Sequence, residues 1–150
     1  MIRDLSVAAL IAVGATVAFA QAKGGAAAIT ERKAAMKAVG GANKALNDMA
    51  KGDVPFDASK VAAAYKAMGD AFAKSKTLYP DDSMTGDTAA LPAVWAKKAD
   101  FQAKLDKAVA DVKSTAASVK DVASLKTNHA AFAKATCGTC HKDYRAPAKK

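Results

Sequence analysis

The stretch DVASLKTNHAAFAKATCGTCH, from Asp121 to His141, decides how the chain is expected to fold. Side chains suited to burial recur along it every three or four residues, the period of one helix face. The predicted buried stripe, with the polar Thr136 as an interruption, is Val122, Leu125, His129, Phe132, Ala133 and Cys140. We therefore expect a helix that starts near Asp121 and carries CGTCH at its end.

Three further helices are predicted upstream, because apolar residues there keep the same three- and four-residue spacing. They run from Ile29 to about Lys51, from the predicted N-cap Asp57 to about Lys76, and from Pro92 to about Ala117. Gly24 to Ala28 reads as a short lead-in, Gly52 as a helix end, and Tyr79 to Ala90 as an irregular loop. No strand alternation or solenoid repeat is present. The fold class expected is all-α, an antiparallel up-down four-helix bundle.

Length and composition agree with one helical domain. The chain has 150 residues, 51% hydrophobic and only 6% aromatic. Much of the apolar share is alanine, which favours helices but fills little volume. The formal net charge is +9, yet the lysines are dispersed and no nucleic-acid-binding signature appears, so no nucleic-acid partner is predicted. A basic surface of this kind suits a redox partner with an acidic docking face.

Residues 1–20 resemble an export signal. Arg3 precedes an apolar run that ends in Ala18-Phe19-Ala20, a small-x-small cleavage pattern. Cleavage there leaves a mature domain of residues 21–150 in the periplasm, with no later segment apolar enough to span a membrane. A retained membrane anchor is the alternative interpretation of residues 1–20.

The pentapeptide Cys137-Gly138-Thr139-Cys140-His141 has the C-x-x-C-H pattern of covalent haem attachment. Residues three and four apart on a helix share a face, so both thiols and the imidazole can address one flat ligand. The two cysteines would form thioethers to the porphyrin, and the His141 nitrogen would bind the iron. One covalent haem c is the predicted cofactor.

Other uses of the two cysteines remain open at this point. Zinc requires four ligands, and His129 is the only other histidine. A thioredoxin-like redox pair belongs at the start of a helix beside a strand, whereas these cysteines lie near the end of a predicted helix. A structural disulfide between them would require only that the chain is exported to an oxidising compartment. His129 itself is expected to be a hydrogen-bonded core side chain, because a residue about three turns along the same helix cannot reach the far side of the ring.

The placement of this motif on the last of four helices resembles the class II cytochromes c, the cytochrome c prime family. The resemblance extends over the mature chain. The supporting segments are Arg32-Lys33-Ala34-Ala35-Met36, Gly86-Asp87-Thr88 leading to Pro92 and Trp95, Lys97-Lys98-Ala99-Asp100-Phe101, and Cys137 to His141. Only the last of these is highly specific.

The resemblance implies roles for four residues outside the motif. Arg32 matches an arginine that lies near a haem propionate in relatives, and Met36 matches the side chain that faces the open side of the iron. Asp87 and Thr88 match positions that approach the haem edge. The resemblance also implies that homodimers are possible.

Met36 divides the functional hypotheses. If its sulfur binds the iron, the haem is low-spin and suited to electron transfer, which is our main expectation. If Met36 only packs beside the iron, a five-coordinate haem can bind nitric oxide or carbon monoxide. Met36 as a core residue without haem contact is the third possibility. No enzyme is predicted, because the first helix offers no histidine as a distal acid or base.

Overall fold

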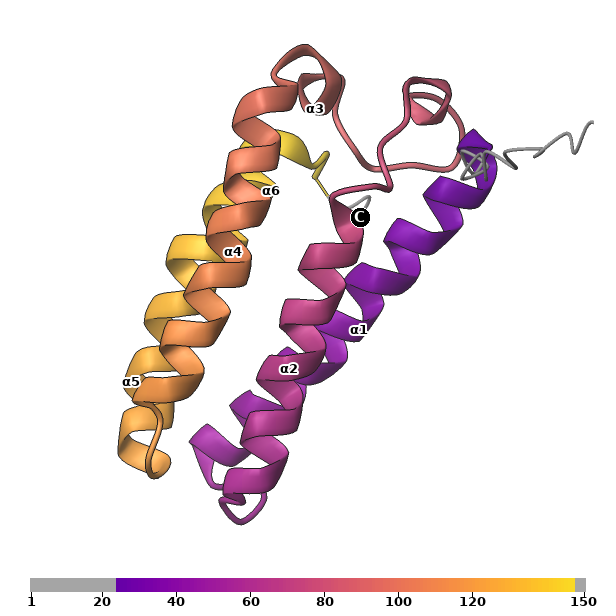
Figure 1. The fold of residues 1–150 in the computed structure, drawn as a ribbon. Coiled ribbons are helices and arrows are strands. Elements are labelled where there is room, and N and C mark those ends of the chain that lie inside the picture. The colour runs from indigo at the N-terminus through magenta and orange to yellow at the C-terminus, as the bar shows by residue number, and fades with distance from the viewer. Residues whose placement is uncertain (1–23, 148–150) are drawn as a thin grey trace, which may run out of the picture.

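The computed structural model describes residues 24–147, and the predicted export segment at residues 1–20 lies outside them. Figure 1 shows a bundle of long helices with an irregular segment at one end. The helical elements are α1 (Gly25–Lys51), α2 (Ala58–Ser75), η1 (Asp81–Ser83), α3 (Ala93–Ala96), α4 (Lys98–Ser118), α5 (Val122–Phe132), η2 (Ala133–Gly138) and α6 (Thr139–Tyr144). None of the helices in this part of the chain is long and apolar enough to cross a bilayer.

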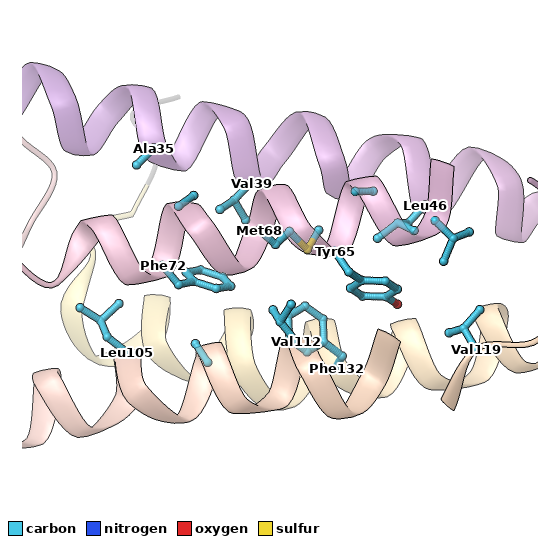
Figure 2. Packing of buried hydrophobic residues seen from close by; sticks show 14 of the residues in the cluster. Ala35, Val39, Leu46, Tyr65, Met68, Phe72, Leu105, Val112, Val119 and Phe132 are labelled. Carbon is cyan, nitrogen blue, oxygen red and sulfur yellow. The ribbon is translucent and has the colours of Figure 1, made fainter. Parts of the chain in front are cut away.

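The predicted antiparallel four-helix bundle is confirmed. Short connections turn α1 back into α2 and α4 back into α5, and α2 packs against α4 while α1 packs against α5. Side chains from all four sides meet in one core (Figure 2). Leu46, Met68 and Leu125 are completely buried there, and such burial contributes about 1.5–3 kcal/mol per side chain.

Local signals set several helix ends where the sequence predicts them. The Asp57 carboxylate accepts hydrogen bonds from the amides of Ser59 and Lys60, at 2.9 and 3.1 Å. Asp121 caps α5 in the same way. Gly52 ends α1 with a φ of 84°, a left-handed conformation that glycine adopts without strain.

The lead-in predicted at Gly24 to Ala28 was wrong, because α1 already begins at Gly25. The Gly25 amide donates to the Asp82 carboxylate at 2.8 Å. A Cβ atom at Gly25 would lie 2.0 Å from the Asp82 carbonyl oxygen. The first turn of α1 is therefore fixed by a close contact with a distant loop, which helical periodicity does not reveal.

The third predicted helix is divided. Lys97 has φ −118° and ψ 44°, which separates the short α3 from α4. The Trp95 indole in α3 donates to the Pro80 carbonyl oxygen at 3.1 Å, whereas α4 packs along α2. Two different packing partners thus orient the two segments separately.

The fourth predicted helix departs from the expected stripe in two ways. Val122 was predicted to be buried but is 40% exposed. It is the first residue of α5, at the end of the bundle opposite the irregular segment. Thr136 is buried instead of merely interrupting the stripe. The helix also passes through a π-helical turn, η2, before the α-helical conformation resumes in α6.

Candidate haem site

The C-x-x-C-H motif straddles the junction between η2 and α6. Cys137 lies in the π-helical turn, and Cys140 and His141 lie in α6. Both cysteines are free thiols, partly buried and packed against the hydrophobic core. Two thiols are therefore held together at the inner side of the bundle and remain available for covalent attachment.

The thiol environment bears on the alternatives to haem. Burial raises the pKa of Cys137 and of Cys140, whereas a thioredoxin-like pair depends on a lowered thiol pKa. Within residues 24–147, no group of three or more histidine, cysteine or acidic side chains could hold a metal ion. The raised thiol pKa values therefore argue against a thioredoxin-like redox pair, and the shortage of ligands argues against a zinc site.

His141 is exposed and lines a surface cavity of about 420 Å³. Leu91, Lys142, Arg145 and Pro147 line the same cavity. Desolvation lowers the pKa of His141, and the charge of Arg145 lowers it further. The imidazole is thereby favoured in its neutral form, the form that binds metals.

The segment that follows the motif is hydrogen-bonded through its backbone to the loop that precedes α3. The Leu91 amide donates to the Tyr144 carbonyl oxygen at 3.0 Å, and the Ala146 amide donates to that of Ala89 at 2.8 Å. Between these bonds, Ala90 and Arg145 form an isolated antiparallel bridge. Backbone hydrogen bonds thus fix the far end of α6.

An aromatic row lies on the core side of the motif and consists of Trp95, Tyr79, Phe101 and Tyr144. The ring of Tyr79 is 4.7 Å from that of Phe101, and Phe101 is 5.1 Å from Tyr144, each in an edge-on arrangement. Tyr144 donates a hydrogen bond to Asp100 on α4, which raises its pKa to about 12. Tyr79 and Tyr144 both interact electrostatically with the Cys140 thiol, so the row lies close to that cysteine.

Arg32 joins the first helix to the opposite end of this row. Its guanidinium carbon lies 4.9 Å from the centre of the Tyr79 ring and 5.6 Å from that of Trp95. Only 4% of Arg32 is exposed. Burial lowers its pKa, an effect that Tyr79 opposes.

The Arg32 guanidinium also organises the loop between α2 and α3. One terminal nitrogen donates to the Leu78 carbonyl oxygen at 3.3 Å and to the Ser83 hydroxyl at 2.8 Å. The other donates to the Ser83 carbonyl oxygen at 2.9 Å and to the Thr88 hydroxyl at 2.6 Å. The structure thus brings Arg32 and Thr88 together, and the contact with a haem propionate stays a prediction.

The two remaining predicted residues lie in different surroundings. Met36 is one helical turn after Arg32 on α1, is partly buried, and packs against the same core as the two cysteines. Asp87 is on the surface, where its carboxylate pairs with Lys33 at 2.5 Å. Met36 is therefore placed toward the interior, whereas Asp87 is not.

These residues fit a covalently attached haem. Two thiols packed against the core and an imidazole four residues after the first of them are the groups that covalent haem attachment requires. Because the thiols face the core and are not consumed by a disulfide, nothing in the described chain competes for them.

His129 is confirmed as a hydrogen-bonded core side chain. It is 1% exposed, its Nδ1 lies 3.1 Å from the Tyr65 hydroxyl, and its Nε2 lies 2.9 Å from the Asn43 side-chain oxygen. Assigning the proton to Nε2 satisfies both contacts, with Tyr65 as a donor and Asn43 as an acceptor. Both ring nitrogens are thus occupied by protein partners.

The pKa of His129 predicts an acid-sensitive fold. Burial lowers this pKa from its ordinary value of 6.5, so between the two values the unfolded chain binds a proton that the folded chain does not. Stability should therefore be intact above about pH 6.5 and fall as the pH decreases through the folded-state pKa. Urea unfolding of the holoprotein at pH 7.5, 6 and 5 measures this loss.

The matched variant His129→Gln removes the titrating group while keeping a polar side chain. We expect a flatter dependence of unfolding free energy on pH for this variant than for the unaltered chain. Parallel curves for the two proteins would contradict a role of His129 in acid sensitivity.

Sequence reasoning did not identify Ser83 or Tyr79 as part of this region. Ser83 is 51 positions from Arg32 in the chain and lies in an irregular loop, where no periodicity marks buried residues. An aromatic residue directly before Pro80 in that loop was a weak available signal for Tyr79.

Comparison with known proteins agrees with the geometry. The family described as Cytochrome C' matches residues 27–145. Cytochrome c' of Rhodopseudomonas palustris is 38% identical over 146 residues, which is 97% of each chain. A cytochrome c-556 of Agrobacterium tumefaciens is 36% identical over 118 residues, covering 78% of this chain and 95% of the relative.

Solved structures show the same fold. The structure of cytochrome c' from Rhodopseudomonas palustris matches with a TM-score of 0.76 and 39% identity, covering 81% of this chain and 98% of that one. Cytochrome c556 of R. palustris matches with a TM-score of 0.73 and 26% identity, covering 81% and 98%. The chain therefore belongs to the cytochrome c' family, and its cofactor is covalently bound haem c with iron.

Proposed function

We propose that the chain is a periplasmic electron carrier in which Cys137 and Cys140 hold one haem through thioethers. In this proposal the His141 imidazole and the Met36 sulfur would be the two protein groups that hold the iron. Haem c supplies a one-electron couple of its iron. The polypeptide would contribute the attachment residues, two ligands to the iron and a hydrophobic core against which the haem could pack.

The observation that carries the proposal is the common burial of Met36, Cys137 and Cys140. These side chains come from opposite ends of the sequence, and all three pack against one hydrophobic core. Arg32 and Met36 are four residues apart on α1 and share a helix face. We infer that a planar group attached at the two thiols would meet Met36 across this shared core.

A methionine ligand suits electron transfer for two reasons. A neutral thioether stabilises reduced iron relative to oxidised iron and raises the reduction potential. In addition, an iron with all six coordination positions filled would not have to gain or lose a ligand when it gains or loses an electron. The aromatic row adds an apolar environment, which further affects the potential.

The surface beside His141 supports a partner with an acidic docking face. Lys142 and Arg145 are exposed at the cavity that His141 lines, and neither forms an ion pair within residues 24–147. Two cations near the cofactor attachment site would attract a negatively charged protein and orient it there. We propose that the surface formed by Lys142 and Arg145 is where the partner binds for electron transfer.

The periplasmic location and the domain division form part of the same proposal. The signal at residues 1–20 would direct export, and the mature domain would begin at residue 21. Thioether attachment would consume both thiols, so no free pair would remain to form a disulfide in an oxidising compartment.

The ligand at the sixth position can be tested with a substitution that removes only the sulfur. Met36→Leu keeps most of the side-chain volume, and we expect it to abolish the low-spin visible spectrum and the weak long-wavelength band of iron bound by methionine sulfur. Met84→Leu is the matched control, because Met84 is 43% exposed and should leave the spectrum unchanged.

The outcomes separate the two proposed kinds of haem protein. A low-spin spectrum that becomes high-spin in Met36→Leu supports the electron carrier. A high-spin spectrum already present in the unaltered holoprotein, with ready carbon monoxide uptake, contradicts it and favours gas binding at an open sixth position.

A further inference from the structure

The helix that carries the motif contains one residue too many for a continuous α-helix. Leu125 and Tyr144 are both buried in the core and are separated by nineteen positions. An α-helix turns by about 100° per residue, so nineteen residues end about 100° beyond five full turns. A regular helix with Leu125 facing the core would therefore point Tyr144, and the motif beside it, toward the side of the bundle.

The π-helical turn η2 lies between these two residues and resolves the mismatch. A π-helix closes its hydrogen bonds over five residues instead of four, so one such turn absorbs one additional residue. The buried stripe accordingly continues through Phe132 and Thr136 to Cys140 and Tyr144, with a constant spacing of four. Both ends of the composite helix face the same core.

Side-chain hydrogen bonds hold this turn in place. The Thr136 hydroxyl donates to the Asp111 carboxylate of α4 at 2.7 Å, and Lys107 donates to the same carboxylate at 2.6 Å. The hydroxyl of Thr139, the first residue of α6, donates to the Ala135 carbonyl oxygen in the turn. The turn is thus tied to the neighbouring helix immediately before Cys137.

We propose that the π-helical turn at Ala133–Gly138 corrects the helical register so that Cys137 and Cys140 face the core, with Thr136 and Asp111 as positioning residues. In this way the turn orients the two cysteine side chains of the attachment motif toward the core. This inference rests on haem attachment at these cysteines, as proposed above.

Deletion of one residue tests the register directly. Removing the exposed Lys134 leaves eighteen positions between Leu125 and Tyr144, which equal five α-helical turns. We expect this variant to form a continuous α-helix, to keep the motif facing the core and to retain covalent haem at the level of the unaltered chain. Intact mass and visible absorbance of the matured protein measure the retention.

Deletion of Lys66 is the matched control. Lys66 is also an exposed lysine, but it lies within the regular helix α2 between the buried Tyr65 and Met68. Its deletion rotates half of α2 by about 100° with no turn to absorb the change. We expect this variant to lose at least tenfold in yield of folded holoprotein.

The possible failures are distinguishable. An unaltered chain without covalent haem refutes attachment at the cysteines. An unaltered chain with covalent haem, together with a Lys134 deletion that fails as the Lys66 deletion does, refutes the register role alone.

A milder pair of variants keeps the chain length unchanged. Thr136→Val removes the hydrogen bond to Asp111. Thr115→Val makes the same chemical change on α4, and Thr115 and Thr136 line one surface cavity that is separate from the cavity at His141. We expect amide hydrogen exchange of residues 134–140 in the holoprotein to become about fivefold to tenfold faster in Thr136→Val only. Equal exchange rates in the two variants would overturn the positioning role of Thr136.

Discussion

A chain with both Cys137→Ala and Cys140→Ala is expected to release all of its haem into acidic acetone. The sequence contains only 2 cysteines, so no other thiol can form a thioether in this variant. Any haem that still enters the bundle would be held by axial ligands and apolar contacts, and acid protonates the histidine ligand. Absorbance of the organic and aqueous phases after extraction measures the partition.

The single variants serve as controls for this extraction. Cys137→Ala and Cys140→Ala each keep one thiol, and we expect each to retain haem through one thioether, although with a lower yield. Haem that remains in the protein phase of the double variant would contradict attachment at the pentapeptide.

Replacement of Arg32 by methionine is expected to produce a large loss of stability. The change removes four hydrogen bonds and leaves the Leu78 carbonyl and the Ser83 groups buried without their donor. An unsatisfied buried polar group costs about 1–3 kcal/mol, and the loop that holds Thr88 would lose its link to α1. We expect a decrease of about 3 kcal/mol in the free energy of unfolding.

Lys33→Met is the matched control for Arg32→Met. Lys33 is the next residue on α1, and its ion pair with Asp87 is on the surface, with side-chain exposures of 55% and 92%. Exposed ion pairs contribute little to stability. Urea denaturation of the two holoproteins should show a much smaller change for Lys33→Met, and equal changes would refute the structural role of the buried guanidinium.

Features of the fold that depend on neighbouring residues in the sequence were predictable. Asp57, Asp121 and Gly52 act within one turn of a helix end, and their roles follow from capping chemistry alone. The helical periodicity of the core likewise depends on local spacing, and Met49 and Met68, which continue this periodicity, are buried.

Features that depend on tertiary contacts were not predictable from the same patterns. The break at Lys97 lies in a sequence without glycine or proline, and it arises because α3 and α4 pack against different segments. The π-helical turn has no local sequence signature either, because it compensates for a difference in helical register between the two ends of one helix. The start of α1 at Gly25 depends on contact with Asp82.

The candidate site divides in the same way. Cys137, Cys140 and His141 were predicted as site residues because their chemistry depends on the spacing within five consecutive residues. Arg32 and Met36 were assigned by resemblance, and the structure places both on the inner side of α1. Ser83 and Tyr79 were not found, because only the folded chain brings their loop to Arg32.

The intact mass of the natively matured protein, followed by peptide mapping, shows whether haem is attached at Cys137 and Cys140. We predict a mass greater than that of the mature polypeptide by one haem group, with the additional mass confined to the peptide that contains Cys137 to His141. A colourless protein with the mass of the bare polypeptide, or haem attached to a different peptide, would contradict it.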